Sequence, residues 1–299
     1  MGVEDCATHG AAVYVFGDPV SKSFSPDFHR AIFTSLKLPW HVSLLESSDV
    51  EDLRRAISEP GFVGAAVTIL NKTSAMAVVE RLTPDAVALK SINTVYVRDD
   101  QGRRVTVGTN TDWLGMSRAI LGLDLGAEDR ARAGGAVVLG TGVLCRTAIY
   151  GLTIGLGASR IYMMHDDASE VEDTLKDLQG VDLPDCHFIH LRSDDYALKF
   201  DARPTIVINA NPSQRTPNSL KSAMLDRHGA KAPGILLDLA SLPGTPTELA
   251  RTLKDAGWKA ATFVDFFAQQ GIEQDSVWTG TSQQQHLERG LEAVSAYLV

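Results

Sequence analysis

The sequence predicts an α/β fold with two domains and mostly parallel sheets. Short apolar runs alternate with stretches of helical length along the whole chain, and a second series of this kind starts with its own glycine turn at residues 140–142. Strands that alternate with helices form crossover units, in which neighbouring strands are parallel. The chain has 299 residues, 44% of them hydrophobic, which is enough for two packed cores.

The first half alternates strand and helix signals and then forms a β-hairpin. Expected strands cover residues 11–16, 40–45, 62–69, 92–97 and 104–107, the last two joined across residues 99–102. Expected helices cover residues 25–36, 49–58 and 72–81. Ser25 is the expected cap of the first helix, because Pro26 then takes the first helical position, where a missing N–H costs nothing.

The second half repeats the alternation more regularly. Expected strands cover residues 135–139, 160–164, 186–191, 204–209 and 235–239. Expected helices cover residues 143–156, 170–178, 220–227 and 247–255, and two further helical segments follow at 263–271 and 282–298. This order is typical of a doubly wound nucleotide-binding sheet.

Charge and cysteine usage limit the classes of partner. The net charge is −9, with acidic and basic residues interleaved, which argues against nucleic acid or an anionic membrane as partner. Cys6, Cys145 and Cys186 show no paired spacing, so a reducing compartment fits. We expect no leader peptide, and none of the apolar runs reaches membrane-spanning length. We therefore expect a cytoplasmic monomer or homodimer that acts on a small molecule.

No motif in the sequence predicts a metal site. His187 and His190 lie three residues apart in an expected strand, so their side chains point to opposite faces and do not share an ion.

The glycine turn at residues 140–142 predicts a Rossmann-type dinucleotide site. It follows an apolar strand and opens an apolar helix, which is the context that this fingerprint requires. Gly140 permits the tight turn, and Gly142 lets a pyrophosphate approach the helix N-terminus. Cys145 takes the third, small position of the fingerprint. The alternative is a plain packing turn.

An acidic segment after the next expected strand favours NAD over NADP. Asp166 is placed to accept hydrogen bonds from the adenosine ribose hydroxyls and to repel an additional phosphate, and no arginine follows at once. Alternatively, Asp166 and Asp167 merely begin the next helix. Both interpretations hold together if one carboxylate caps the helix while the other binds ribose.

Asp112 and Lys72 form the expected catalytic pair. Asp112 ends a polar strand-to-helix turn at the predicted domain junction, where ligand clefts usually form. Oxidation of an alcohol by a nicotinamide needs a base that takes the hydroxyl proton, and a lysine whose surroundings favour the neutral amine serves this purpose. An aspartate within reach would orient that lysine. The competing readings are a helix cap at Asp112 and a solvated lysine at position 72.

Five segments resemble, in the correct order, the motifs of one family: residues 21–29, 66–72, 91–94, 110–112 and 270–280. The chain is similar over nearly its whole length to the shikimate and quinate dehydrogenases. Ala66 and the ending QGIEQDSVWTG look most like the fungal quinate dehydrogenase type. The resemblance implies a substrate-binding domain of residues 1–111, an NAD-binding Rossmann domain of residues 112–262, and C-terminal helices, 263–299, that pack back on the substrate domain.

The resemblance also implies roles for individual residues. Lys72 and Asp112 would be catalytic. The substrate, a small polyol acid such as quinate or shikimate, would be bound by Ser23, Ser25, Thr68, Asn93 and Gln270. NAD would be bound by Gly140, Thr141, Gly142, Val143, Leu144, Asp166 and Asn211, with NADP the less favoured dinucleotide.

The implied reaction is reversible oxidation of quinate, shikimate or both to the 3-dehydro acid. Several positions depart from the family pattern: Leu70 and Asn71 before the lysine, Val143 and Leu144 in the glycine loop, Trp113, and Ser241 where a tyrosine is common. These departures keep two alternatives open, a dehydrogenase for another polyol acid and a non-catalytic regulator of the same fold.

Overall fold

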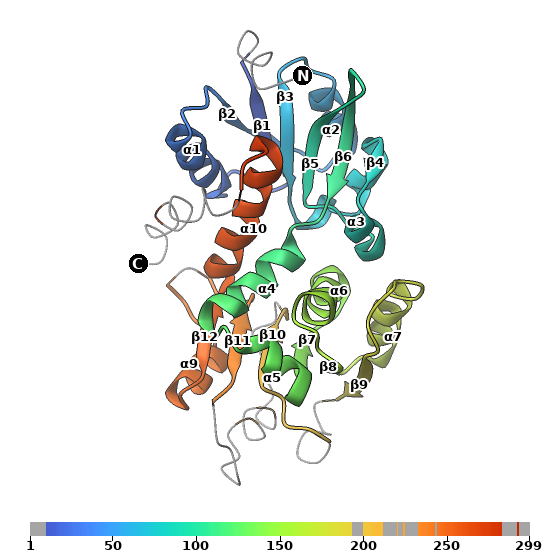
Figure 1. The fold of residues 1–299 in the computed structure, drawn as a ribbon, viewed down its shortest axis with the longest axis vertical. Helices are drawn as coiled ribbons and strands as arrows, with labels where there is room; N and C mark the ends of the chain where they lie inside the picture. Colours follow the sequence, from blue (N-terminus) through green and yellow to red (C-terminus); the bar gives the residue numbers. More distant parts are fainter. Residues whose placement is uncertain are drawn as a thin grey trace. The chain divides into compact units, whose positions relative to one another are not determined.

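The computed structural model describes residues 10–192, 200–211, 220, 224, 233–242, 244–282 and 292. The chain forms two compact units (Figure 1). Unit 1 extends to Asp112 and includes the chain again from Gln270, and unit 2 is Trp113–Gln269. The chain thus passes from one unit to the other inside two helices, α4 (Asp112–Leu123) and α10 (Phe263–Thr279).

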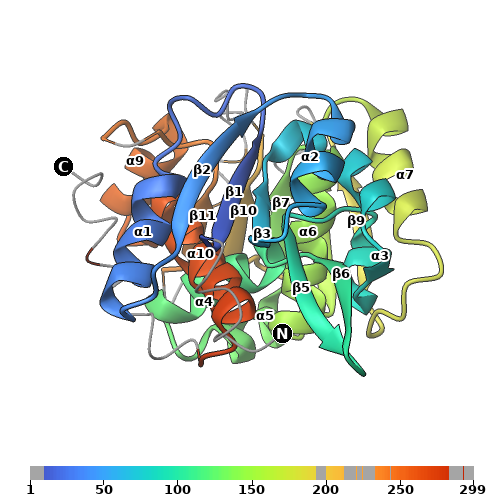
Figure 2. The same ribbon diagram turned by 90° about the horizontal axis from the view of Figure 1, so that it is seen from above.

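Unit 1 contains a mixed six-stranded sheet in the order β2-β1-β3-β5-β6-β4. Figure 2 shows the first five of these strands, and β4 is labelled in Figure 1. The strands are β1 (Ala12–Gly17), β2 (His41–Glu46), β3 (Phe62–Val67), β4 (Arg81–Leu82), β5 (Thr94–Asp100) and β6 (Arg103–Thr109). β1 is parallel to β2 and β3, and β4 to β6, whereas the β5–β6 hairpin makes the pairs β3–β5 and β5–β6 antiparallel. The helices of this part are α1 (Ser25–Ser35), α2 (Val50–Ile57), α3 (Pro84–Leu89) and two 3₁₀ turns, η2 (Ile69–Asn71) and η3 (Ser74–Val78).

This strand order brings the polar motifs of unit 1 to one edge of the sheet. β1, β3 and β6 run in the same direction, so the segments that follow Gly17, Val67 and Thr109 leave the sheet on the same side. Thr94, the first residue of antiparallel β5, pairs with Thr109 at this edge. The motifs at residues 21–29, 66–72, 91–94 and 110–112 therefore converge although they are far apart in sequence.

Unit 2 contains a fully parallel sheet in the order β12-β11-β10-β7-β8-β9. Its strands are β7 (Ala136–Leu139), β8 (Arg160–Met164), β9 (His187–Leu191), β10 (Ile206–Asn209), β11 (Ile235–Asp238) and β12 (Lys259–Thr262). Counted from β7, this is the order 6-5-4-1-2-3 of the Rossmann fold, with the reversal of strand order between β7 and β10. Dinucleotides bind at such a reversal.

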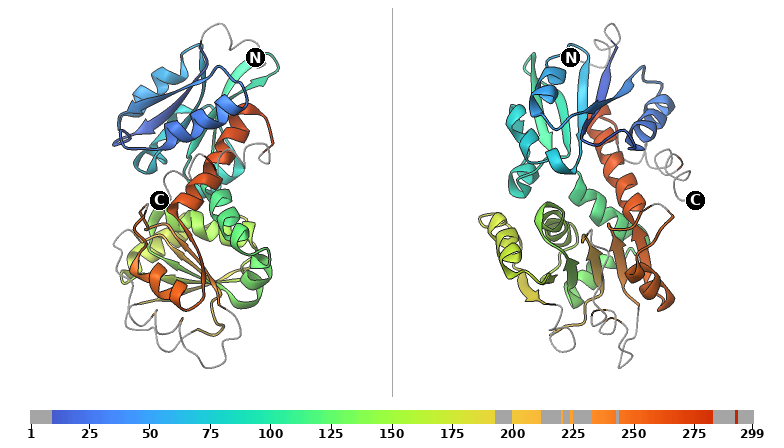
Figure 3. Two further views of the ribbon diagram at one scale, coloured as in Figure 1. Left: turned by 90° about the vertical axis from the view of Figure 1, so that its left-hand side faces the viewer. Right: turned by 180° about the vertical axis from the view of Figure 1, so that it is seen from behind.

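Helices cover both faces of this sheet (Figure 3). Alternate strand residues, such as Val138 and Ile208, pack with α4, α5 (Ala127–Gly134) and α6 (Gly142–Tyr150). The residues between them, such as Val137 and Val207, pack with α9 (Glu248–Asp255) on the opposite face. Burial on both faces explains why these strands are apolar throughout rather than alternating.

The end of α10 packs on the sheet of unit 1. An added Cβ on Gly64 of β3 would lie 2.2 Å from the indole nitrogen of Trp278, so only glycine allows this ring to approach the strand. The same indole N–H donates to the Val95 carbonyl at 2.9 Å. His29 of α1 and Asp275 of α10 form a fully buried pair at 2.9 Å. These contacts hold Gln270–Thr279 against the sheet.

The structure corrects several expected elements. Residues 72–81 do not form one α-helix: η3 and then β4 occupy this range. Ser25 is the first residue of α1 rather than its cap, which is Phe24. The helix expected over 143–156 begins at Gly142 and ends at Tyr150, where a π-helical turn, Gly151–Gly155, follows.

The structure also contains elements that the sequence did not predict, namely α3, β4, α5 and β12. α10 is longer than the expected 263–271. Most of the expected helix 220–227 and nearly all of 282–298 lie outside the described residues. The remaining helix, α7, covers Ala168–Asp177. Within the described ranges, none of the helices combines the length and the apolar character that a membrane span requires.

Candidate active site

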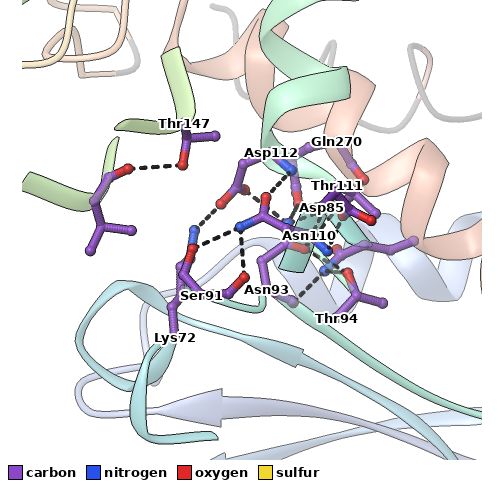
Figure 4. Close-up of polar contacts among 12 residues, drawn as sticks. Lys72, Asp85, Ser91, Asn93, Thr94, Asn110, Thr111, Asp112, Thr147 and Gln270 are labelled. Atoms are coloured by element: carbon purple, nitrogen blue, oxygen red, sulfur yellow. Dashed lines mark hydrogen bonds and ion pairs between the residues drawn. The ribbon is translucent and has the colours of Figure 1, made fainter. Parts of the chain in front are cut away.

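Lys72 and Asp112 form a buried ion pair at the polar edge of unit 1 (Figure 4). The Lys72 Nζ lies 2.5 Å from the Asp112 Oδ2, and the side chains are only 9% and 3% exposed. Lys72 directly follows η2, and Asp112 is the first residue of α4. Burial of two charges is costly unless they pair, so a lysine at this position is neither solvated nor incidental.

The carboxylate of Asp112 is held by a second donor. Asn93 Nδ2 donates to Asp112 Oδ1 at 2.8 Å, which leaves Oδ2 to Lys72. The backbone N–H of Asp112 donates to Asn110 Oδ1 at 3.0 Å. Because the helix begins at Asp112 and its carboxylate faces Lys72 and Asn93, the structure differs from the simple cap interpretation.

Asn93 is the centre of the hydrogen-bond network. Its Nδ2 lies within 3.0 Å of three acceptors, Asp112 Oδ1, Thr111 Oγ1 and Gln270 Oε1, although a carboxamide nitrogen carries only two protons. Its Oδ1 accepts from the Thr111 backbone N–H and the Thr94 hydroxyl, both at 2.8 Å. All of these groups are buried.

A further set of contacts fixes the turn before α4. Asp85, in the first turn of α3, accepts the Asn110 backbone N–H at 3.0 Å and the Thr109 hydroxyl at 3.2 Å. The Asn110 amide donates to the Ser91 hydroxyl at 3.0 Å. Asn110 therefore connects the Asp112 backbone to two neighbouring segments. This restricts the position of the Asp112 carboxylate.

Two glutamines of α10, one turn apart, contact Asn93 from the same helix face. Gln270 Oε1 accepts from Asn93 Nδ2 at 3.0 Å. Gln274 Nε2 donates to the Asn93 carbonyl at 2.9 Å and to the Thr94 hydroxyl at 3.1 Å. Sequence reasoning identified Gln270 but missed Gln274, because the expected helix ended at residue 271. Asp85 was missed with α3, although Thr83-Pro84-Asp85 is a typical helix start.

The remaining predicted substrate residues lie at the same sheet edge but outside this network. Ser23 Oγ accepts the Ser25 backbone N–H at 3.2 Å. Thr68 follows β3, and an added Cβ on Gly17, whose φ is +154°, would lie 1.6 Å from its hydroxyl. In the described part of the chain no hydrogen bond joins Ser23, Ser25 or Thr68 to Lys72 or Asn93.

The glycine turn of unit 2 contains two glycines with positive φ, one packed and one open. Gly140 (φ +106°) and Gly142 (φ +77°) both adopt backbone angles that favour glycine. An added Cβ on Gly140 would lie 3.2 Å from Cys145 Sγ, whereas one on Gly142 would meet nothing within 4 Å. The open side of the turn is therefore at Gly142, where α6 begins. Val143 and Leu144 follow, half-buried, in its first turn.

Cys145 is a packing residue of this turn. Burial raises the pKa of its thiol to about 12, so the thiol stays protonated and unreactive at neutral pH. Because an added Cβ on Gly140 would lie only 3.2 Å from the Cys145 Sγ, a larger side chain at position 145 would crowd the turn.

The two acidic residues after β8 have different surroundings. Asp167 caps α7: its side chain accepts from the Ser169 and Glu170 backbone N–H groups. Hydrogen bonds from the Ser169 side chain and backbone hold the pKa of Asp167 below its usual range. Asp166 is exposed next to this cap. Asn211 follows β10 at the strand-order reversal, and its N–H donates to Asn209 Oδ1 at 3.3 Å.

Two of the positions that depart from the family pattern have structural tasks. The Ser241 hydroxyl donates to the Asp238 carbonyl at 2.7 Å and accepts the Phe263 N–H at 3.0 Å, so it links β11 to the start of α10. The Trp113 ring packs edge-on against Tyr150 at 5.3 Å between ring centres.

In the described ranges, no group of three or more histidine, cysteine or acidic side chains is arranged to hold a metal ion.

Comparison with known proteins agrees with this architecture. Residues 15–95 match the family model of the shikimate dehydrogenase substrate binding domain. The quinate dehydrogenase of Emericella nidulans is 30% identical over 287 residues, which cover 89% of this chain and 87% of that protein.

Two solved structures share the fold. The dehydroquinate dehydratase and shikimate dehydrogenase from S. pombe has a TM-score of 0.78 and 26% identity, over 94% of this chain and 53% of that chain. The shikimate dehydrogenase of Mycobacterium tuberculosis has a TM-score of 0.75 and 23% identity, over 96% of this chain and 99% of that chain. Extended identity and a shared two-domain α/β architecture lead to one conclusion: this chain belongs to the shikimate and quinate dehydrogenase family of NAD(P)-dependent oxidoreductases.

Proposed function

We propose that the protein oxidises the ring alcohol of quinate, shikimate or both to the 3-dehydro acid, reversibly, with NAD as electron acceptor. The observation that carries the proposal is the buried Lys72–Asp112 pair, which Asn93 and Gln270 border with further hydrogen-bonding groups. A buried ion pair is a costly feature with little benefit for stability, and proton transfer gives it a purpose.

In this proposal, Lys72 is the general base for the alcohol. Lys72 acts as the base only in its deprotonated form: the amine takes the hydroxyl proton and so becomes the ammonium of the ion pair with Asp112, whose Oδ2 lies 2.5 Å away. In the reverse direction the ammonium returns the proton to the carbonyl oxygen. Asn93 holds the second carboxylate oxygen of Asp112, so the pair keeps one orientation through the reaction. The bound nicotinamide supplies the hydride-accepting carbon.

The other predicted residues orient the polyol acid. Ser23 and Ser25 offer hydroxyl donors for the substrate carboxylate, and Asn93 contacts a ring hydroxyl. Thr68 is a further substrate contact, and Gln270 closes over the substrate. We assign substrate binding to residues 1–111 and to the C-terminal helices 263–299. Ser23, Ser25, Thr68 and Asn93 lie at one sheet edge, which supports the first assignment, because ligands bind beside the carboxyl ends of parallel strands. The contacts of Gln270 and Gln274 with Asn93 support the second.

We assign the dinucleotide to residues 112–262. The residues that would hold it are Gly140, Thr141, Gly142, Val143, Leu144, Asp166 and Asn211. The open side of Gly142 at the N-terminus of α6 fits a pyrophosphate, and the exposed Asp166 fits the unphosphorylated ribose of NAD. We further expect the protein to act in the cytoplasm, since Cys145 and Cys186 are free thiols. A monomer or homodimer is our expectation for its oligomeric state.

A matrix of activity assays tests this proposal. Quinate and shikimate are each mixed with NAD and with NADP, and nicotinamide absorbance is followed. We expect turnover of at least one acid, with a higher kcat/KM for NAD. No turnover of either acid with either dinucleotide contradicts the proposal. Calorimetric titration of each dinucleotide, with and without quinate, separates a binding failure from a chemical one.

One observation favours a second candidate, a dehydrogenase for a less polar relative of these acids. Ile69 and Leu70, in the turn just before Lys72, are 53% and 76% exposed, an unusual state for two adjacent aliphatic side chains. A substrate with an apolar edge would cover them. If Leu70→Asn raises the kcat/KM for quinate, the native substrate is less polar than quinate.

A further inference from the structure

The glycine turn of unit 2 is fastened to α7 by two hydrogen bonds. The hydroxyl of Thr141, between the two glycines, donates to Glu170 Oε2 at 2.6 Å. The backbone N–H of Gly142 donates to Thr174 Oγ1 at 3.0 Å, and that hydroxyl donates to the Glu170 carbonyl at 2.8 Å. Glu170 and Thr174 lie one helical turn apart on α7, so one helix face supports the turn.

This arrangement places a carboxylate beside the loop to which we assign the pyrophosphate. Glu170 is in the first turn of α7, and its side chain is 55% exposed. His165 Nε2 lies 3.8 Å from Glu170 Oε2 and is a cation only when protonated. The neighbouring carboxylate of Asp167 is occupied by the helix cap. Support of the turn alone does not require a charge, since a neutral acceptor at position 170 would bind the Thr141 hydroxyl equally well.

The position of Glu170 matches the adenosine end of a bound dinucleotide. In a doubly wound sheet the adenosine ribose lies near the turn after the first strand and the segment after the second. Here these are the Thr141 turn after β7 and the segment from Asp166 to Glu170 after β8. NAD has a neutral 2′-hydroxyl at this place, whereas NADP has a dianionic phosphate.

We propose that Glu170, hydrogen-bonded to Thr141, is a specificity-determining residue that rejects the 2′-phosphate of NADP. The proposal rests on the proposed preference for NAD. It adds Glu170, a residue of α7, to Asp166 as a second determinant of that preference. The carboxylate repels the phosphate by charge while its contact with Thr141 keeps it from turning away. Specificity of this kind comes from a repulsive element rather than from a new contact to the favoured ligand.

The test is Glu170→Gln, which removes the charge and keeps an oxygen to accept the Thr141 hydroxyl. Glu172→Gln is the matched control: it makes the same change of charge on the same helix, at a residue that pairs with Lys176 at 3.2 Å. The Kd values of NAD and NADP are measured by calorimetry without substrate, at low and at high salt.

For Glu170→Gln we expect about tenfold tighter binding of NADP at low salt, since one charge beside a dianion at a part-exposed site has this order of effect. NAD binding should change by less than about twofold, and the NADP effect should shrink at high salt. Glu172→Gln should leave both Kd values nearly unchanged.

An unchanged NADP affinity in Glu170→Gln overturns the proposal, and so does an equal shift in Glu172→Gln, which would indicate a general surface field. A wild-type preference for NADP also overturns it. These titrations contain no polyol acid. Their result can therefore be interpreted even if the protein does not turn over quinate or shikimate. Binding of neither dinucleotide contradicts this inference and the proposed cofactor together.

Discussion

Around Lys72, side chains from separate segments of unit 1 supply nearly every contact, whereas the glycine turn of unit 2 consists of backbone and small residues. In unit 1, Asp112 and Asn93 are buried and use almost all of their hydrogen-bonding capacity within the protein. In unit 2, Gly142 faces open space. The first site should therefore be sensitive to the removal of single side-chain atoms, and the second to the addition of atoms to the backbone.

The largest effect is expected for Lys72→Met, which keeps the length of the side chain and removes the amine. Loss of a general base lowers kcat by roughly 10²–10⁴-fold. Steady-state kinetics with the best substrate measure this loss, and calorimetry should show unchanged dinucleotide binding. The exposed Lys254→Met on α9 is the control and should keep full activity.

A second variant distinguishes a loss of activity through misfolding from a loss of activity through removal of the base. Lys72→Met leaves Asp112 buried without its cation, which costs about 3–5 kcal/mol. Lys72→Met combined with Asp112→Asn removes both charges and should recover most of that stability in urea unfolding, but no activity. A kcat within tenfold of wild type in either variant would exclude Lys72 as the base.

Two alanine substitutions in the glycine turn test whether this turn is sensitive to atoms added to the backbone. Gly140→Ala places a methyl group 3.2 Å from Cys145 Sγ and 3.3 Å from the Ala210 carbonyl at a φ of +106°. It should cost about 3 kcal/mol in urea unfolding. Gly142→Ala has open space and should cost only about 1–2 kcal/mol, from its φ of +77°.

Dinucleotide affinity should rank the two variants differently. Gly142→Ala projects its methyl group into the space where a phosphate would approach, so a tenfold or greater rise in the Kd of NAD is expected, about 1.4 kcal/mol or more. If Gly142→Ala binds NAD as tightly as wild type, the pyrophosphate does not lie over this glycine.

The smallest effect is expected for Asp85→Ala, which acts on the active site through Asn110. It removes the acceptor of the Asn110 N–H and the Thr109 hydroxyl, so the turn before Asp112 loses support. We expect about a tenfold fall in kcat/KM for the polyol acid, roughly one charge-assisted hydrogen bond, with an unchanged Kd for the dinucleotide.

The control lies in the β5–β6 hairpin, at the end opposite to the Asp85 contacts. Asp99 accepts the Gly102 N–H at 2.9 Å in the turn between β5 and β6, so Asp99→Ala also removes a carboxylate that accepts a backbone N–H. Asp85→Asn keeps one acceptor oxygen and should recover part of the activity. An equal loss in Asp99→Ala would show that Asp85 only stabilises the fold.

Much of the fold follows from local sequence signals. Apolar strands bounded by glycine predict β7 and β11 closely, because a parallel sheet buried on both faces leaves little choice of residue. The error at residues 72–81 has a non-local cause. The side chain of Asn71 donates to the Ser48 carbonyl and the Ile92 N–H to the Lys72 carbonyl, so distant segments hold this stretch as short turns. Periodicity within a window contains no information about such partners.

The site was predictable only in part for a similar reason. Lys72, Asp112, Asn93 and Gln270 come from motifs that resemble a known family, and the structure brings their polar atoms together. Gln274 lies in the last of these motifs, but the sequence assigns it no role, and Asp85 lies in none of them; the contacts of both residues depend on where α10 and α3 pack. Glu170 is also invisible in sequence, because its meaning depends on its contact with Thr141.

The arrangement at Asn93 has a consequence for the thermodynamics of ligand entry. Two amide protons face three acceptors, so one acceptor among Asp112, Thr111 and Gln270 is always unserved by this amide. An incoming hydroxyl that donates to one of these acceptors would not need a proton from this amide. We therefore expect the two amide protons to be shared among the three acceptors, and a bound polyol to select one arrangement. Substrate binding then lowers the number of arrangements and raises the number of bonds, so we expect a favourable enthalpy opposed by entropy.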